Sequence, residues 1–136
     1  MTRALVILSL VLLAACGNDG PPLVASDVVV RQPMPGMQMT AGYLVLHNNS
    51  DEDIAIDRVA SPQFGKVEMH ETVIEDGIAR MSALAEIVVP AGSAVEFQPG
   101  GKHLMLMRPG DNLKPVTLEF YSDGAIVLTV SVSAGN

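Results

Sequence analysis

Short β-branched runs separated by turn-forming residues constrain the fold of this chain more than any other feature of its sequence. From Leu23 onward, apolar runs alternate with clusters of Gly, Pro, Asn and Asp, and no helical repeat of useful length occurs. Many short strands at such spacing are typical of an antiparallel sandwich or barrel, so we predict an all-β fold. The expected strands cover 28–30, 43–47, 54–59, 66–74, 78–81, 87–89, 94–97, 103–107, 116–121 and 126–132.

Two Asp-Gly pairs predict tight hairpins within this fold. Asp76-Gly77 and Asp123-Gly124 each separate two strand-like runs, and this dipeptide favours the type I′ turn. A two-residue turn at Asp76-Gly77 would pair His70 with Ala83 and place Met81 on the face of His70. A three-residue turn would place His70 and Met81 on opposite faces. The second pair of runs, 116–120 and 126–130, is expected to close one sheet.

The N-terminus has the features of a secretory signal. Arg3 precedes an apolar run that ends near Leu13, too short for the roughly 20 residues of a membrane-spanning helix. Leu13-Ala14-Ala15-Cys16 resembles the lipobox of bacterial lipoproteins, in which the cysteine becomes the lipidated first residue. The alternative is an ordinary signal with an incidental cysteine. We predict a lipoprotein signal peptide at 1–15, lipidated Cys16 with a flexible tether at 16–26, and a β-sandwich domain at 27–136.

Composition excludes several classes of function. The net charge of −7 argues against a nucleic-acid-binding protein, which needs a basic surface for phosphates. A single cysteine can form neither an intramolecular disulfide nor a thiolate zinc cluster. No nucleophilic triad and no glycine-rich phosphate loop is apparent, so we do not expect an enzyme. The acidic residues are interpreted as a solvated surface, with steering of a cation or basic partner as the alternative.

Histidine and methionine gather in three of the expected strands, with Met69-His70 on one, Met81 on the next and His103, Met105 and Met107 on a later one. Because side chains alternate along a strand, His103, Met105 and Met107 lie on one face, while Leu104 and Leu106 point into the core. Thioether sulfur is a soft, neutral ligand that suits monovalent copper. In an oxidising compartment, methionine also avoids the disulfide that a cysteine pair would form, although it can become a sulfoxide.

The alternative for each methionine is plain packing, since methionine is a flexible core filler. Met69 alternates with His70 and is expected in the core. Met34, Met37 and Met39 lie among prolines and glycine, which predicts a loop. This loop would cover the metal site, provide a second weak copper contact, or pack on the sandwich. His47, beside turn residues, is left out of the site.

The spacing of four of these residues resembles the signature of a known family. His70, ten residues, Met81, twenty-one residues and then His103-Leu104-Met105 resemble the motif of the periplasmic copper chaperones called PCu(A)C. The surrounding segments 40–48, 67–71 and 100–107 are also similar to that family. The resemblance extends from about Val28 to Val132.

The resemblance implies a cupredoxin-like antiparallel β-sandwich of Greek-key type that binds one Cu(I). His70, Met81, His103 and Met105 would be the ligands. Delivery to the binuclear copper centre of cytochrome c oxidase is implied, alone or alongside a thioredoxin-like copper assembly protein. We expect a monomer held by its lipid on the periplasmic side of the cell envelope.

Other readings of the same residues remain open. Met107 would either contact copper during its transfer or pack beneath the site. A secondary site would accept Cu(II). A copper-sequestering tolerance protein would use the same four ligands without dedicated delivery. An electron carrier of the blue-copper type would need a thiolate, which an acylated Cys16 cannot supply. A plain lipoprotein with structural Met and His is the last alternative.

Overall fold

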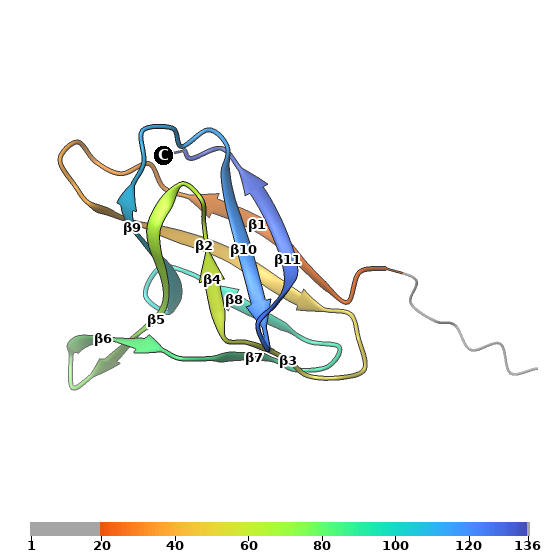
Figure 1. Cartoon of the computed structure of the whole chain (residues 1–136). Coiled ribbons are helices and arrows are strands. Elements are labelled where there is room, and N and C mark those ends of the chain that lie inside the picture. Colours follow the sequence, from red (N-terminus) through yellow and green to blue (C-terminus); the bar gives the residue numbers. More distant parts are fainter. Residues whose placement is uncertain (1–19, 136) are drawn as a thin grey trace, which may run out of the picture.

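Eleven strands form the regular structure of residues 20–135, the part of the chain described by the computed structural model (Figure 1). Within these residues no helix has the length and hydropathy needed to cross a bilayer. The strands are β1 (Leu23–Val30), β2 (Met39–Asn48), β3 (Ile54–Ile56), β4 (Arg58–Ala60), β5 (Phe64–Glu75), β6 (Ile78–Leu84), β7 (Ile87–Val89), β8 (Ala94–Phe97), β9 (Lys102–Pro109), β10 (Val116–Ser122) and β11 (Ala125–Val132).

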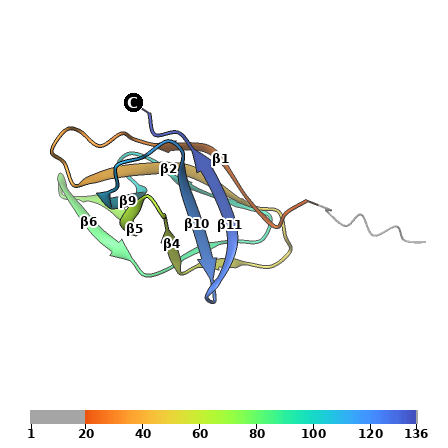
Figure 2. The same cartoon turned by 45° about the horizontal axis from the view of Figure 1, so that its top comes forward.

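The strands form antiparallel sheets with a non-sequential order. The largest sheet runs β1-β2-β9-β5-β6, and β8 also pairs with β2. A second sheet runs β11-β10-β4, and β3 pairs with β7. Figure 2 shows β10 and β11 lying across β1 and β2 as a separate layer. The expected all-β, cupredoxin-like sandwich is therefore confirmed, and its crossovers place β9 between β2 and β5.

The core lies between these layers. In the large sheet, β2 and β9 contribute alternate residues to it, as the period of two requires, whereas β6 is mostly exposed. Leu104 and Leu106 of β9 and Phe120 of β10 are fully buried, and Met69 of β5 is 4% exposed. The expected core role of Met69 is confirmed. The opposite face of the large sheet is left free to carry polar and thioether side chains.

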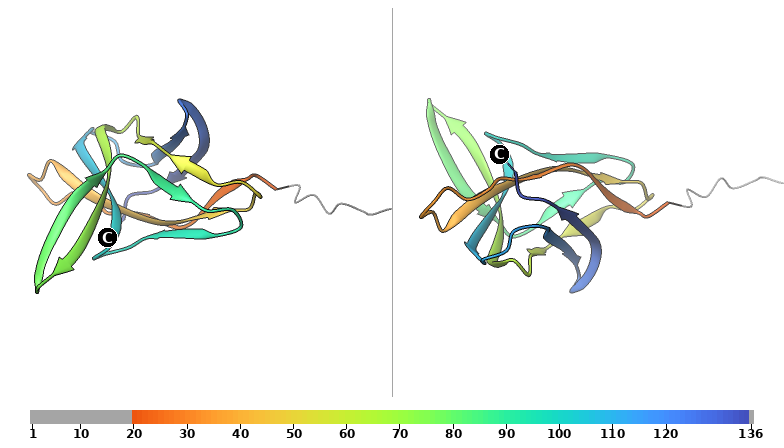
Figure 3. Two further views of the ribbon diagram at one scale, coloured as in Figure 1. Left: turned by 90° about the horizontal axis from the view of Figure 1, so that it is seen from below. Right: turned by 90° about the horizontal axis from the view of Figure 1, so that it is seen from above.

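Both Asp-Gly turns are confirmed, because all four residues have the positive φ of a type I′ turn. Asp76 and Gly77 have φ of 51° and 76°, and Asp123 and Gly124 have 49° and 77°. Glu75 pairs with Ile78 and His70 with Ala83, so the two-residue register is the correct one. The β5–β6 hairpin projects beyond the body of the sandwich (Figure 3).

Most expected strands are longer in the structure, and two of the differences change the expected organisation of the chain. The run 54–59 is split at Asp57 into β3 and β4, which belong to different sheets. Asp57 accepts a hydrogen bond from the Asp123 backbone at 2.8 Å, and its own N–H donates to Tyr121, which turns the chain between the sheets. At the N-terminus, β1 begins at Leu23, which is 1% exposed. The last residues of the expected 16–26 tether therefore belong to the sandwich.

Candidate metal centre

Two histidines from distant parts of the sequence lie opposite each other in the large sheet. Because β9 pairs with β5, His70 is the direct cross-strand partner of His103. Their ring centroids are 5.9 Å apart, with the ring planes tilted by 45°. His70 is buried, at 9% exposure, and His103 is partly buried. The sheet thus brings two imidazoles together at one point on its outer face.

Methionines flank this pair on the same face. Met105 follows His103 by two residues on β9, whereas the intervening Leu104 is buried. Met81 on β6 pairs with Thr72, which lies two residues beyond His70 on β5. Met81 is therefore one diagonal step from His70, as the hairpin register predicted, and its side chain is 53% exposed. The fold places all four expected ligand residues on one face, with the histidines at the centre.

The partner of His70 determines which of its nitrogens can bind a metal. Nε2 of His70 lies 2.9 Å from Oε2 of Glu68, two residues back on the same face. A carboxylate only accepts hydrogen bonds, so Nε2 carries the proton and donates it. In the neutral ring, Nδ1 is then left with its lone pair. It is buried, and no group within residues 20–135 hydrogen-bonds to it. A buried, unpartnered imidazole nitrogen is a natural metal ligand.

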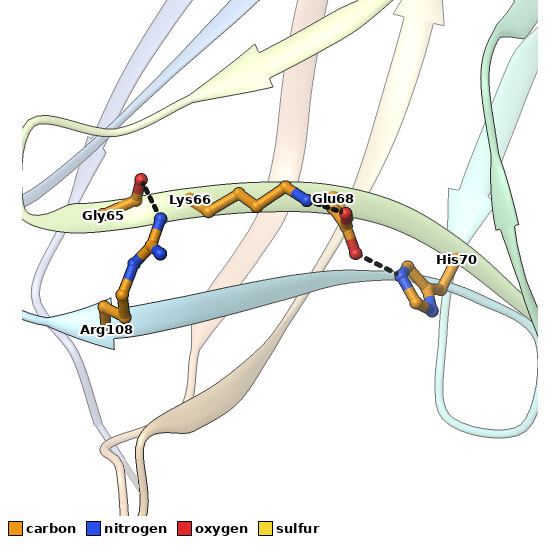
Figure 4. A network of polar contacts seen from close by, with 5 residues as sticks. All are labelled: Gly65, Lys66, Glu68, His70 and Arg108. Atoms are coloured by element: carbon orange, nitrogen blue, oxygen red, sulfur yellow. Dashed lines mark hydrogen bonds and ion pairs between the residues drawn. The ribbon is translucent and has the colours of Figure 1, made fainter.

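Glu68 is held in the ionised state that this arrangement requires. It forms an ion pair with Lys66 in addition to its contact with His70, and all three side chains lie along one side of β5 (Figure 4). The hydrogen bond from Lys66, followed by the one from His70, lowers the pKa of Glu68 below its usual value. The carboxylate therefore remains an acceptor that fixes the ring orientation and tautomer of His70.

His103 is oriented in the same way by a backbone group. Its Nδ1 lies 3.0 Å from the carbonyl oxygen of Gly101, which can only accept. In the neutral ring, the proton therefore resides on Nδ1, and Nε2 presents its lone pair. Both histidines thus have one nitrogen held by an outer acceptor and the other available, the arrangement typical of metal-ligating imidazoles.

The atoms available as metal ligands suit a soft monovalent cation. They are two neutral imidazole nitrogens and two thioether sulfurs, and such ligands favour Cu(I) over Mg²⁺, Ca²⁺ or a thiolate-type zinc site. Within residues 20–135, no group of three or more His, Cys, Asp or Glu converges as a metal site. A surface hollow of about 260 Å³ adjoins the pair, lined by Met39, Thr40, Ala41, Tyr43, His103 and Met105.

The structure also places the secondary residues. Met107 lies on the face of His103 and Met105, and it pairs directly with Met39. Met39 is the first residue of β2, so its assignment to the loop was wrong, while Met34 and Met37 do lie in the β1–β2 loop. Cys16, the predicted lipidation site, lies outside the described residues. His47 hydrogen-bonds to Ser26 at 2.9 Å on β1 and is separate from the site.

The sequence did not reveal the two groups that accept hydrogen bonds from the histidines, the Glu68 carboxylate and the Gly101 carbonyl. Glu68 could have been identified, because a residue two positions from His70 on a strand shares its face. The role of the Gly101 carbonyl had no such signal, since it depends on the backbone path entering β9.

Replacing Glu68 with alanine is expected to weaken Cu(I) binding roughly 10- to 100-fold, the usual cost of losing an outer-shell partner of a ligating histidine. Competition with a chromophoric Cu(I) chelator measures this change. Glu68→Gln should recover most of the affinity, because the amide oxygen still accepts from Nε2. Glu71→Ala is the matched control, since Glu71 pairs with Lys102 at 2.9 Å instead. Equal Cu(I) affinities of the Glu68→Ala and Glu71→Ala variants would exclude the role of Glu68 in positioning His70.

Comparison with known proteins identifies the family. A family model described as "Putative lipoprotein LpqE-like" matches residues 23–132, and the chain belongs to this LpqE-like family. A "Putative lipoprotein" from Leifsonia xyli subsp. xyli is 33% identical over 97 residues, covering 66% of this chain and 57% of that protein. An uncharacterised protein of Rickettsia prowazekii is 26% identical over 101 residues, covering 71% and 56%. The matched segment thus spans little more than half of each relative.

Solved structures share the fold. The copper-bound PCuAC domain from PmoF2 superposes with a TM-score of 0.64 at 20% identity, covering 84% of this chain and 92% of that domain. The Cu(I)-bound form of DR1885 from Deinococcus radiodurans gives a TM-score of 0.63 at 25% identity, covering 90% and 83%. The sandwich of this chain is therefore the fold of PCuAC domains.

Proposed function

We propose that this chain is a Cu(I)-binding metallochaperone of the bacterial cell envelope, with His70, Met81, His103 and Met105 as its ligands. The observation that carries the proposal is the direct pairing of His70 with His103, each with one nitrogen held by an outer acceptor. The copper bound to the PmoF2 domain and to DR1885 supports the choice of metal.

The site is suited to holding copper reversibly. Four neutral ligands bind Cu(I) less tightly than thiolates would, and a donor protein must release its cargo. The site lies on an outer sheet face, and Met81 is the most exposed of the four ligands. An incoming ligand from a recipient would displace Met81 first, and the buried His70 last. Copper then moves by ligand exchange without a change of oxidation state.

The proposed recipient is the copper-bearing subunit of cytochrome c oxidase, reached directly or through a thioredoxin-like assembly protein. The choice of this recipient rests on the resemblance of the motif to that of PCu(A)C chaperones. The chain acts as a carrier and not as an enzyme. Lipidation at Cys16 would hold it on the periplasmic side of the membrane, in keeping with the lipoprotein description of its family.

A transfer assay separates delivery from sequestration. The Cu(I)-loaded chain is mixed with the apo copper domain of the oxidase subunit, and the copper content of both is measured after separation. Delivery predicts that copper moves to the recipient faster than it is released to buffer alone. A chain that holds copper and passes none to the recipient would instead be a copper-sequestering tolerance protein.

A further inference from the structure

A second group of methionines lies next to the proposed copper site. Met39 of β2 and Met107 of β9 are direct cross-strand partners, on the outer face that carries Met105. Met34 and Met37 lie in the loop that leads into β2. Four of the chain's methionines therefore gather at one end of the β2–β9 pair, beyond the four proposed ligands.

Three of these four side chains lie largely outside the core. Met34, Met37 and Met39 are 69%, 46% and 46% exposed, whereas Met69 of the core is 4% exposed. Leaving large apolar side chains in water forgoes the stabilisation that burial would give. Their exposure leaves the thioether sulfurs accessible to a ligand.

The backbone holds the loop beside Met107. The Met37 N–H donates to the Met34 carbonyl at 2.9 Å, closing a turn that contains Gly36 with a φ of 81°. The N–H of Arg108 donates to the Gln38 carbonyl at 2.8 Å, which ties the end of the loop to the strand that carries Met107. These hydrogen bonds fix the turn from Met34 to Met37 and attach Gln38, the next residue, to β9.

We propose that Met37, Met39 and Met107 form a second, weaker Cu(I) site, with Met34 available as a fourth thioether. Neutral sulfur ligands without imidazole or carboxylate select a soft monovalent cation. The site is the weaker of the two because it has no imidazole and because Lys66 pairs in register with Met107. Lys66 directs its ammonium toward Glu68, which limits its repulsion of a bound cation.

The second site adjoins the first and would pass copper to it. Met105 lies two residues from Met107 on the same face, roughly 7 Å along the strand. Met39, His103 and Met105 all line the 260 Å³ hollow. Cu(I) would move between the sites by exchanging one thioether for another, with no electron or proton transferred. This relay role rests on the proposed function, whereas the existence of the second site does not.

Cu(I) titration of the full chain in detergent, with a competing chromophoric chelator, tests the proposal. Cys16→Ala is introduced throughout to remove the only thiol. We expect two equivalents, the second bound at least roughly tenfold more weakly for lack of imidazole. Met39→Leu/Met107→Leu should lose the second equivalent and retain the first. Met69→Leu, on the buried face of β5, is the matched methionine control and should retain both.

Other outcomes of the titration test the second site and the ligand assignment of the proposed function separately. A single equivalent in the parent chain, or a second equivalent that survives in Met39→Leu/Met107→Leu, would overturn the second site. Persistence of the strong equivalent in His70→Ala/His103→Ala would instead overturn the ligand assignment of the proposed function. Shifts of the methionine methyl NMR signals on adding Ag(I), a redox-stable analogue of Cu(I), should include Met39 and Met107 and spare Met69. Absence of shifts at Met39 and Met107 would contradict the second site.

Discussion

The double variant His70→Ala/His103→Ala is expected to lose high-affinity Cu(I) binding. Both imidazoles are oriented by an outer acceptor, which leaves the other ring nitrogen of each to bind the metal. Loss of an outer-shell partner alone typically costs roughly 10- to 100-fold in metal affinity, and loss of the two nitrogens themselves should exceed that range. The remaining thioethers would hold copper only weakly. Chelator competition measures the affinity directly.

His47→Ala is the matched control for the histidine variants. His47 lies on β2 and hydrogen-bonds to Ser26, so its removal leaves the proposed ligands in place. Its Cu(I) affinity should equal that of the parent chain. Near-parental affinity in the double variant would mean that copper is bound elsewhere, and a loss of equal size in His47→Ala would point to a structural effect.

Leu104→Ala is expected to destabilise the fold by about 2–5 kcal/mol, the usual cost of a large-to-small change in a packed core. Leu104 is fully buried, and it lies between His103 and Met105 in sequence. Since domains are stable by only about 5–15 kcal/mol, this is a large share of the total. Chemical unfolding followed by circular dichroism measures the change. Adding Cu(I) should raise the unfolding midpoint of the variant, because all four ligands remain.

Ile126→Ala on β11 is the control for this prediction. Ile126 is 52% exposed, and its loss should change the free energy of unfolding by no more than about 1 kcal/mol. Equal destabilisation by the two substitutions would show that burial in the sandwich core is not what stabilises β9. A Leu104→Ala chain of normal stability that fails to bind copper would assign Leu104 to the site itself.

Local patterns predicted the parts of the site that lie within one strand or one hairpin. The alternation of His103, Leu104 and Met105 follows from the period of a β-strand, and the Asp76-Gly77 turn fixed the register of Met81 against β5. These relations depend only on residues close in sequence. They were therefore accessible before the arrangement of the sheets was known.

Relations between distant strands were not predictable from sequence patterns alone. The position of β9 between β2 and β5 brings His103 opposite His70 and Met107 opposite Met39. Neither pairing leaves a signal in local periodicity, because it results from how the chain crosses between sheets. The break between β3 and β4 at Asp57 was also not predictable, because it depends on hydrogen bonds with Tyr121 and Asp123 of the β10–β11 hairpin.

X-ray absorption spectroscopy of the chain loaded with one equivalent of Cu(I) tests the central claim most directly. The proposed centre has two imidazole nitrogens and two thioether sulfurs around a single copper ion. The spectrum should therefore fit two nitrogen and two sulfur neighbours, and His70→Ala should lose one nitrogen. A first shell of sulfur alone, or of nitrogen and oxygen without sulfur, would contradict the His70, Met81, His103 and Met105 site.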